Sequence, residues 1–132
     1  MAGSSASLHE APELLRPETL EHHRALASLM EELEAIDWYQ QRIDATQDDE
    51  LREILAHNRE EEKEHAAMTL EWLRRHDPGL DEKLRMYLYA EGSIVGREEQ
   101  LEGAEHGGEA PRRRDGSLGL GSLRSIAPID RP

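Results

Sequence analysis

The sequence predicts an all-α protein built on an antiparallel two-helix hairpin, followed by a shorter third helix. Two long segments, residues 18–45 and 49–75, contain neither Gly nor Pro and are rich in strong helix formers. Apolar residues recur along both segments in steps of three and four, and no strand-like alternation is present. Because only a few residues separate the two segments, the helices must fold back against each other.

The expected ends of the helices have local causes. Pro17 suits a helix start, since proline is tolerated in the first turn. The polar stretch TQDD (46–49) predicts a tight turn, and HDPG (76–79) predicts the end of the second helix because Pro and Gly stop helices. A third helix is expected over about residues 80–91.

Changes in composition predict how the chain is organised. Residues 1–16 are expected to be a flexible leader and residues 17–92 the helical domain. After Gly92 the chain is rich in Gly and charge, which predicts a flexible linker over residues 93–114. Residues 115–132 become apolar again and are expected to form a C-terminal tail.

The apolar content is low for a chain that must bury a core alone. Hydrophobic residues make up 36% of the 132 residues, and Phe is absent. A hairpin by itself cannot cover the apolar stripes of both helices. We therefore expect a two-fold homodimer that closes a four-helix bundle.

Charge and residue usage exclude several classes of function. The formal net charge of −13 argues against nucleic-acid binding, although it suits a protein that attracts cations. The absence of Cys excludes disulfides, thiolate metal sites and cysteine nucleophiles. No stretch looks like a signal peptide or reaches the roughly 20 apolar residues of a membrane span. These features predict a cytoplasmic protein with no membrane partner.

Ionisable groups interrupt the apolar stripe near the centre of both long helices. One side of the first helix carries Ala25, Leu29, Glu32, Ile36, Tyr39 and Ile43. One side of the second helix carries Leu51, Leu55, Asn58, Glu62, His65, Thr69 and Trp72. A carboxylate inside a bundle costs several kcal/mol unless a positive charge compensates it, and a bound metal ion does so.

The spacing of these groups suits a metal site. Glu62 and His65 are three residues apart and share one helix face, and antiparallel pairing can bring Glu32 level with them. Di-iron carboxylate bundles use a Glu from each of two helices and a Glu-x-x-His pair from each of the other two, so one chain holds half the set. Such ligands suit iron, manganese or zinc. The alternative is a solvated Glu/His face, with each stripe shifted by one position.

Two further clusters share helix faces. The first comprises Glu31, Glu34 and Trp38, next to the Glu32 stripe, where carboxylates could receive incoming cations. The second comprises His57, Glu61 and Glu64, which could bind a metal weakly. A solvated charged surface is the simpler interpretation of both. The aromatic residues Trp38 and Tyr39 make redox chemistry more attractive, but each is more often a packing residue.

Two parts of the chain resemble a known family. MEELEAIDWYQQR (30–42) together with AHNREEEKEHAAMTLEWLRR (56–75) resembles the encapsulated ferritins of bacteria, and the similarity covers roughly residues 8–92. The tail sequence DGSLGLGSLR (115–124) resembles the cargo-loading peptide that docks such proteins inside an encapsulin nanocompartment. The two resemblances lie in separate parts of the chain and agree.

The resemblance implies a ferritin-like four-helix bundle formed by two chains, with five such homodimers in a ring, a decamer. A di-iron ferroxidase centre across the dimer interface would take Glu32, Glu62 and His65 from both chains, with Tyr39 close by. Glu31, Glu34 and Trp38 match the region through which metal reaches the centre. Iron oxidised there would be stored inside the encapsulin shell, within the cytoplasm.

The tail also has a physical rationale. Leu118, Leu120 and Leu123 are separated by Gly and Ser, so they can occupy shallow apolar pockets of the shell protein while the backbone stays extended. A long linker would let this peptide reach the shell wall.

The expected function is therefore a ferroxidase that oxidises Fe²⁺ with dioxygen, although other divalent metals fit the same ligands. One alternative is a rubrerythrin-like peroxidase on the same metal pair. The absence of Cys weakens it, because no fused rubredoxin centre can supply electrons. A second alternative is a non-catalytic, metal-binding helical cargo or adaptor protein.

Overall fold

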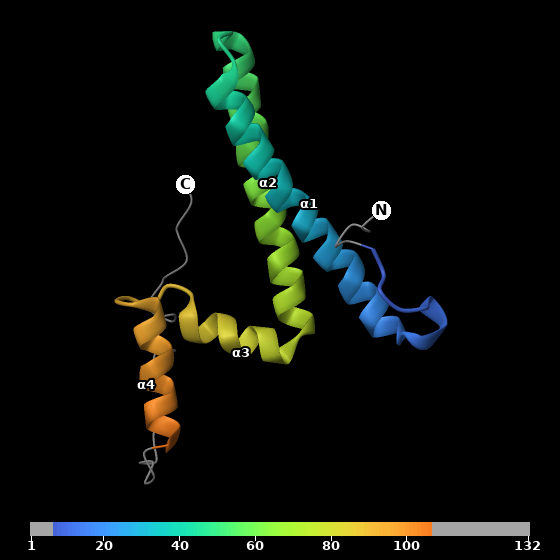
Figure 1. Ribbon diagram of the computed structural model, residues 1–132, viewed down its shortest axis with the longest axis vertical. Helices are drawn as coiled ribbons and strands as arrows, with labels where there is room; N and C mark the ends of the chain where they lie inside the picture. The colour runs from blue at the N-terminus through green and yellow to red at the C-terminus, as the bar shows by residue number, and fades with distance from the viewer. Residues whose placement is uncertain (1–6, 107–132) are drawn as a thin grey trace, which may run out of the picture. The chain divides into compact units, whose positions relative to one another are not determined.

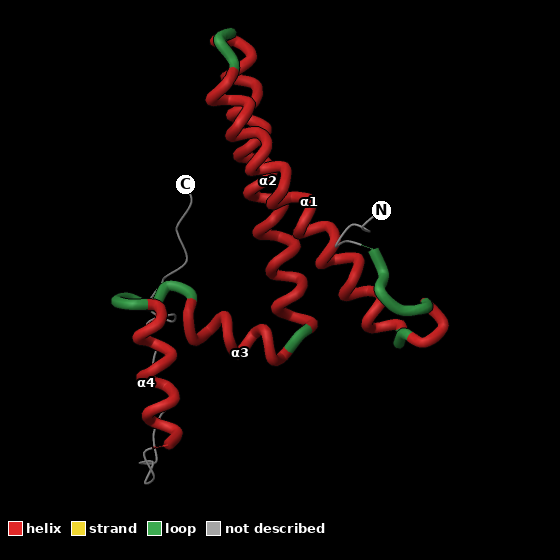
Figure 2. Tube along the Cα trace, viewed as in Figure 1, coloured by secondary structure: helices red, strands yellow, loops and turns green. Residues whose placement is uncertain are grey.

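The computed structural model describes residues 7–106, and every regular element in that range is helical. The elements are the 3-10 turn η1 (Pro12–Leu14) and the helices α1 (Pro17–Ala45), α2 (Asp49–His76), α3 (Pro78–Tyr87) and α4 (Ile94–His106), as Figures 1 and 2 show. The predicted all-α fold class is confirmed. Within the described range, no helix has the length and apolar character needed to cross a membrane. The chain divides after Asp77 into two compact units.

The two long helices begin and end close to where the sequence predicts. Pro17 occupies the first turn of α1. Residues 46–48 make the turn, and Asp48 caps α2 because its carboxylate accepts a hydrogen bond from the backbone N–H of Leu51 at 3.0 Å. The Arg52 guanidinium donates to carbonyl oxygens in the last turn of α1 and in the turn itself. These bonds fix the geometry with which α2 returns along α1.

The helices α1 and α2 run antiparallel and side by side (Figure 1). They lie closest together toward the turn at residues 46–48 and diverge toward the other end. Most residues of the two predicted stripes are half-buried, but Leu51 is 44% exposed and the side chain of His65 is also 44% exposed. On α1 the stripe lies on the less exposed side, whereas on α2 the fully buried Ala66 and Leu73 lie one position beyond the stripe residues His65 and Trp72. The placement of a metal site inside a bundle stays a prediction.

The hairpin has very little core of its own. Among the described residues, only Ala66 and Leu73 are fully buried. Large apolar side chains remain exposed on both helices, namely Leu26, Met30, Leu33, Trp38, Leu51, Ile54 and Met68. Covering such surface is favourable by about 25 cal/mol per Å². This exposure is what a partner chain would remove, although the homodimer itself stays a prediction.

The diverging end of the hairpin is held by two histidines and a tryptophan. The Nε2 atom of His22 on α1 donates a hydrogen bond to the backbone carbonyl of His76 at 2.9 Å. The His22 ring also meets the Trp72 indole edge-on, with centroids 5.9 Å apart. The His76 ring stacks on that indole with centroids 3.9 Å apart, and its Nδ1 donates to the Trp72 carbonyl. The last turn of α2 is thereby capped from both helices.

Replacing His22 should loosen this end of the hairpin. We expect His22→Ala to lower the free energy of unfolding by about 1 kcal/mol, because one interhelical hydrogen bond and one aromatic contact are lost. His23→Ala is the control, since His23 makes no such bond to another described residue; its effect should stay within about 0.5 kcal/mol. Urea unfolding of metal-free protein at a fixed concentration measures both. Equal losses of stability in His22→Ala and His23→Ala would contradict the role assigned to His22.

The second unit contains α3 and α4, and α3 differs from its predicted range. It covers Pro78–Tyr87 instead of residues 80–91, so it begins earlier and ends earlier. Pro78 fits the first turn of a helix, which is why the proline begins α3 rather than only ending α2. The backbone of Tyr89 has φ 61°, a left-handed conformation that no helix continues through.

Helix α4 lies within the segment predicted to be a linker, residues 93–114. The Ser93 hydroxyl accepts a hydrogen bond from the N–H of Gly96 at 2.9 Å and so caps the helix. The Arg97 side chain donates to the Met86 carbonyl at 3.2 Å and joins α4 to α3. The Gly-rich composition was misleading here because the residues between the glycines are good helix formers. A linker role for residues 93–114 stays a prediction.

Candidate metal centre

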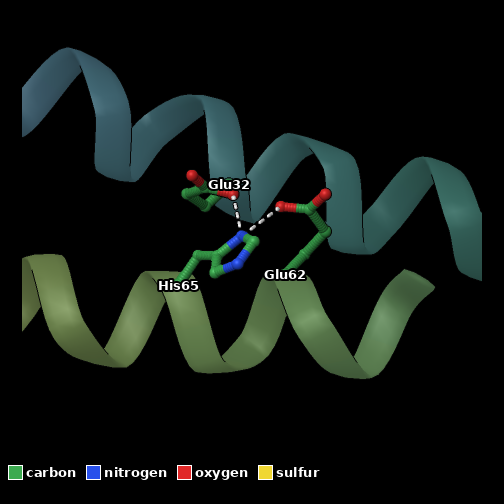
Figure 3. A group of neighbouring side chains, drawn as sticks. All are labelled: Glu32, Glu62 and His65. Atoms are coloured by element: carbon green, nitrogen blue, oxygen red, sulfur yellow. Dashed lines mark hydrogen bonds and ion pairs between the residues drawn. The ribbon is translucent and has the colours of Figure 1, made fainter. Parts of the chain in front are cut away.

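Three ionisable side chains converge between the middles of α1 and α2 (Figure 3). Glu32 projects from α1, and Glu62 and His65 project from α2 one turn apart. The three-residue step puts Glu62 and His65 on one face of α2. The antiparallel pairing then brings the two helices level at this point, as the sequence predicts.

The geometry of the group suits a single small cation. The Nδ1 atom of His65 lies 3.3 Å from a carboxylate oxygen of Glu62 and 3.7 Å from one of Glu32. One potential ligand atom from each residue lies within 4.8 Å of the others. The side chains of Glu32 and Glu62 are 25% and 22% exposed, whereas His65 is 44% exposed. The site is therefore sheltered between the helices but open on the side of His65.

The two carboxylates have pKa values shifted in opposite directions. The pKa of Glu32 is raised, chiefly by the hydrogen bond it shares with Glu62 and also by burial. The pKa of Glu62 is lowered, chiefly by the same hydrogen bond. The hydrogen bond to Glu62 raises the pKa of His65, and attraction to Glu32 adds to this. Protons thus balance part of the negative charge, a role that a metal ion can take over.

The donor set determines which ions fit. Two carboxylates and one imidazole offer oxygen and nitrogen ligands and no sulfur, a combination that suits iron, manganese or zinc. Three protein ligands leave coordination positions free for a second set of ligands, for water or for substrate. The residues present therefore fit a divalent transition metal.

Two supporting contacts had no assigned role in the sequence analysis. The Thr69 hydroxyl donates to the His65 carbonyl at 3.1 Å, within the turn that carries the imidazole. The Arg42 guanidinium lies over the Tyr39 ring, 5.5 Å from its centroid, as in a cation–π contact. Spacings of four and three residues along a helix were the sequence signals for these contacts.

The other predicted site residues lie outside the three-residue group. Tyr39 is half-buried on the same side of α1 as Glu32. Glu31, Glu34 and Trp38 are exposed. Their proposed part in metal uptake stays a prediction.

The second cluster is only partly assembled. A nitrogen of His57 lies 3.0 Å from a carboxylate oxygen of Glu61, and both side chains are more than half exposed. Within the described part of the chain, Glu64 does not join them in a converging group of three potential ligands. Metal binding there stays a prediction. The predicted shell-docking residues Leu118, Leu120 and Leu123 lie outside the described residues.

The fold and the site together define a class: a helical hairpin that carries a group of two carboxylates and one imidazole able to hold a metal ion. Comparison with known proteins agrees. Residues 7–91 match the family model described as EncFtn-like. The chain is 56% identical to the encapsulated ferritin-like protein of Rhodospirillum rubrum, over all of this chain and 98% of that protein. It is 48% identical to a ferritin-like protein of Thermotoga maritima, covering 87% and 96% of the two chains.

Two further similarities concern a cargo protein and a solved structure. The encapsulin nanocompartment cargo protein EncC of Myxococcus xanthus is 47% identical over 47 residues, 36% of each chain. The crystal structure of protein ne0167 from Nitrosomonas europaea has a TM-score of 0.65 at 55% identity, covering 67% of this chain and 97% of that one. The chain belongs to the EncFtn-like family of encapsulated ferritin-like proteins.

Proposed function

We propose that this protein is a ferroxidase that oxidises Fe²⁺ with dioxygen at a di-iron centre shared by two copies of the chain. The observation that carries the proposal is the convergence of Glu32, Glu62 and His65 between the two long helices. Membership of a ferritin-like family supports iron as the metal. The iron is the substrate, and its oxidised form is delivered for storage.

The need for a second copy follows from ligand number and exposure. One chain supplies two carboxylates and one imidazole, which is half the ligand set of a di-iron carboxylate bundle. His65 lies on the open side of the site and is 44% exposed, so ligands from a second chain can approach it. A two-fold axis through the site would complete the set without any further residue type. The family resemblance extends this dimer to a ring of five dimers.

The residues have separate tasks in this scheme. Glu32 and Glu62 supply anionic oxygens, which hold two cations close together and favour the more highly charged ferric product. His65 fixes each ion to α2 through a nitrogen ligand. Each Fe²⁺ gives up one electron, so the pair supplies the two electrons that reduce dioxygen to peroxide when two protons are added. Tyr39, seven residues after Glu32 on the same side of α1, is assigned a supporting part.

Exposed acidic residues near the site suit the supply of cations. Glu31 and Glu34 are exposed on α1, as is the aromatic ring of Trp38, and we assign all three to the path by which iron reaches the centre. The overall charge of −13 would concentrate cations around the molecule.

The direct test is iron oxidation by the full-length protein. We expect rapid oxidation of Fe²⁺ in air, above the rate of a protein-free control, with dioxygen consumed as ferric iron forms. Faster oxidation with hydrogen peroxide than with dioxygen would instead favour the peroxidase alternative. Tight binding of iron without oxidation would favour a non-catalytic metal-binding protein.

Metal affinity should rise with pH. The pKa values of Glu32 and His65 are raised, so both groups hold protons more tightly than usual, and an incoming metal must displace those protons. Zn²⁺ binding should therefore weaken as pH falls through the raised pKa of His65. Isothermal titration calorimetry at pH 8 and pH 6, in buffers of different ionisation enthalpy, measures both the affinity and the protons released.

An affinity independent of pH, with no proton release, would contradict this prediction. Glu71 provides the contrast within the same helix. Hydrogen bonds from Arg74 and Arg75 lower the pKa of its carboxyl to about 2, so it stays ionised over the whole range. Replacing Glu71 by Gln should leave the pH dependence unchanged.

We further propose that the protein works as cargo inside an encapsulin shell. Its family and its similarity to an encapsulin nanocompartment cargo protein support this role. We assign residues 115–132 to shell docking, through Leu118, Leu120 and Leu123. Residues 93–114 are assigned to the connection between this tail and the helical domain, residues 17–92.

Removing the tail should abolish encapsulation and leave the chemistry intact. We expect a chain truncated before Ser117 not to be captured by a co-expressed encapsulin, because the three leucines are the apolar contacts of the docking peptide. Its iron oxidation rate should match that of the full-length chain. Co-purification of cargo with assembled shells measures capture, and undiminished capture of the truncated chain would disprove the docking role.

A further inference from the structure

Met68 lies on the face of α2 that carries both His65 of the candidate metal centre and Trp72. It is three residues after His65 and four residues before Trp72, so the three side chains follow one another along the helix. A long side chain on a helix lies over the turn that precedes its own Cα, which for Met68 is the turn of His65. Met68 is 58% exposed. Its thioether is therefore a neighbour of the metal centre and is open to small molecules.

A pocket of about 420 Å³ opens between α1 and α2 next to Met68. Ala25 of α1 and Met68, Thr69 and Trp72 of α2 are among the residues that line it. The Thr69 hydroxyl donates to the His65 carbonyl, so the pocket begins about one helical turn from the imidazole. Met68 and Trp72 also line a second pocket, of about 490 Å³, whose lining residues all belong to α2. A small molecule that leaves the centre on this side therefore meets Met68 before Trp72.

The other methionines in the described part of the chain are placed differently. Met30 is on α1, two residues before Glu32, a step that turns it by about 200° around the helix and so away from the centre. Met86 is half-buried on α3, in the second unit. Met68 is thus the one described methionine that shares a helix face with a residue of the candidate centre.

We propose that Met68 is a sacrificial oxidation site, which takes up oxidant made at the metal centre before the oxidant reaches Trp72. The inference rests on the proposed ferroxidase function and adds a modification site to it. Trp72 contacts the rings of His22 and His76 and so helps to hold the diverging end of the hairpin. Oxidation of the indole would disturb these contacts, whereas methionine sulfoxide can be reduced again by methionine sulfoxide reductases.

The oxidant is a product of the proposed reaction. Two Fe²⁺ ions reduce dioxygen to hydrogen peroxide, and a further Fe²⁺ splits the O–O bond of peroxide by one electron, which gives Fe³⁺, a hydroxide ion and a hydroxyl radical. The radical adds to the sulfur of Met68. The adduct then gives one electron to Fe³⁺ and releases the hydroxyl proton, which leaves the sulfoxide. Proton and hydroxide form water, so peroxide and thioether become sulfoxide and water.

The position of Met68 matters because of the reactivity of this oxidant. A hydroxyl radical reacts with the first organic groups that it meets, whereas hydrogen peroxide diffuses into the solvent. Radicals made at the centre should therefore select side chains by nearness to the centre, and peroxide added from outside should select them by exposure. The two sources of oxidant predict different patterns of modification on the same chain.

Peptide mass spectrometry of the full-length protein tests the site. We expect the ratio of Met68 sulfoxide to Met30 sulfoxide to be at least about fivefold higher after aerobic Fe²⁺ oxidation than after addition of hydrogen peroxide to Zn²⁺-loaded protein. Added peroxide should follow exposure, which is 58% for Met68 and 37% for Met30. Rapid iron oxidation with the same ratio in both treatments would overturn the inference and leave the ferroxidase standing. Absence of iron oxidation would contradict the proposed function, and this inference with it.

The variant Met68→Leu tests the protection of Trp72. Leucine keeps an apolar side chain of similar volume but has no sulfur to oxidise. The variant should oxidise Fe²⁺ at the wild-type rate, and the fraction of Trp72 that gains oxygen during turnover should rise several-fold. Met30→Leu is the matched control and should leave Trp72 oxidation at the wild-type level. Equal Trp72 oxidation in the two variants would contradict the protective role of Met68.

Discussion

Replacing Glu62 by Gln should remove rapid iron oxidation. The substitution keeps the size of the side chain and deletes the negative charge that bridges His65 and Glu32. Loss of an outer-shell contact alone lowers metal affinity or activity by about 10- to 100-fold, so loss of a direct ligand should cost at least as much. In the proposed dimer two such losses would occur, because a two-fold axis would repeat each ligand.

Matched variants separate this effect from a general loss of charge. Glu53 is exposed on the same helix and has no place in the site, so Glu53→Gln should oxidise iron at the wild-type rate. Circular dichroism should show unchanged helix content in both variants. If Glu62→Gln oxidises Fe²⁺ as fast as Glu53→Gln, then the carboxylate of Glu62 is not a ligand of the reacting iron.

Divalent metal should drive the chain from smaller to larger species, and His65→Ala should prevent this. The hairpin buries little apolar surface by itself. Its site offers only three ligands, so a bound ion would gain its remaining ligands only when a second chain binds. Binding to the paired state alone stabilises it by about 2.7 kcal/mol when free metal is 100 times the dissociation constant.

Size-exclusion chromatography with light scattering measures this shift. Wild-type protein should elute as a smaller species after chelation and as a dimer or larger assembly with Zn²⁺ or with Fe²⁺ under anaerobic conditions. His23→Ala should behave like the wild type, because His23 is remote from the site in sequence. An elution profile that does not respond to metal would contradict metal-driven assembly.

The sequence was a good guide to the site because the site depends on helical repetition. The segments around Glu32 and Glu62 lack Gly and Pro, so the register of each helix is continuous, and a three-residue step can be read as one face. The short turn at residues 46–48 then leaves antiparallel pairing as the only arrangement. These local rules were sufficient to bring two carboxylates and an imidazole together.

Features that depend on tertiary contacts were not predictable in the same way. The bond from His22 to the His76 carbonyl joins residues 54 positions apart, and no periodicity signals it. The early end of α3 depends on the left-handed backbone of Tyr89, a non-glycine residue that rarely adopts this conformation. Helix α4 was not predicted because Gly96 and Gly103 were taken as signs of a linker, although the residues between them favour a helix.

The apolar periodicity of the sequence also did not predict that α1 and α2 diverge. Both stripes continue to the open end of the hairpin, which predicts contact along the whole length, yet a pocket opens between Ala25 and Trp72. The apolar pattern alone therefore does not predict this space.

The measurement that tests the central claim most directly is a single-turnover titration. Protein is loaded anaerobically with increasing Fe²⁺ and mixed rapidly with air-saturated buffer, and the amplitude of the fast oxidation phase is recorded. A di-iron centre shared by two chains predicts that this amplitude saturates at about one Fe²⁺ per chain, two per dimer. A missing fast phase, or an amplitude that saturates at about two Fe²⁺ per chain, would contradict the shared centre.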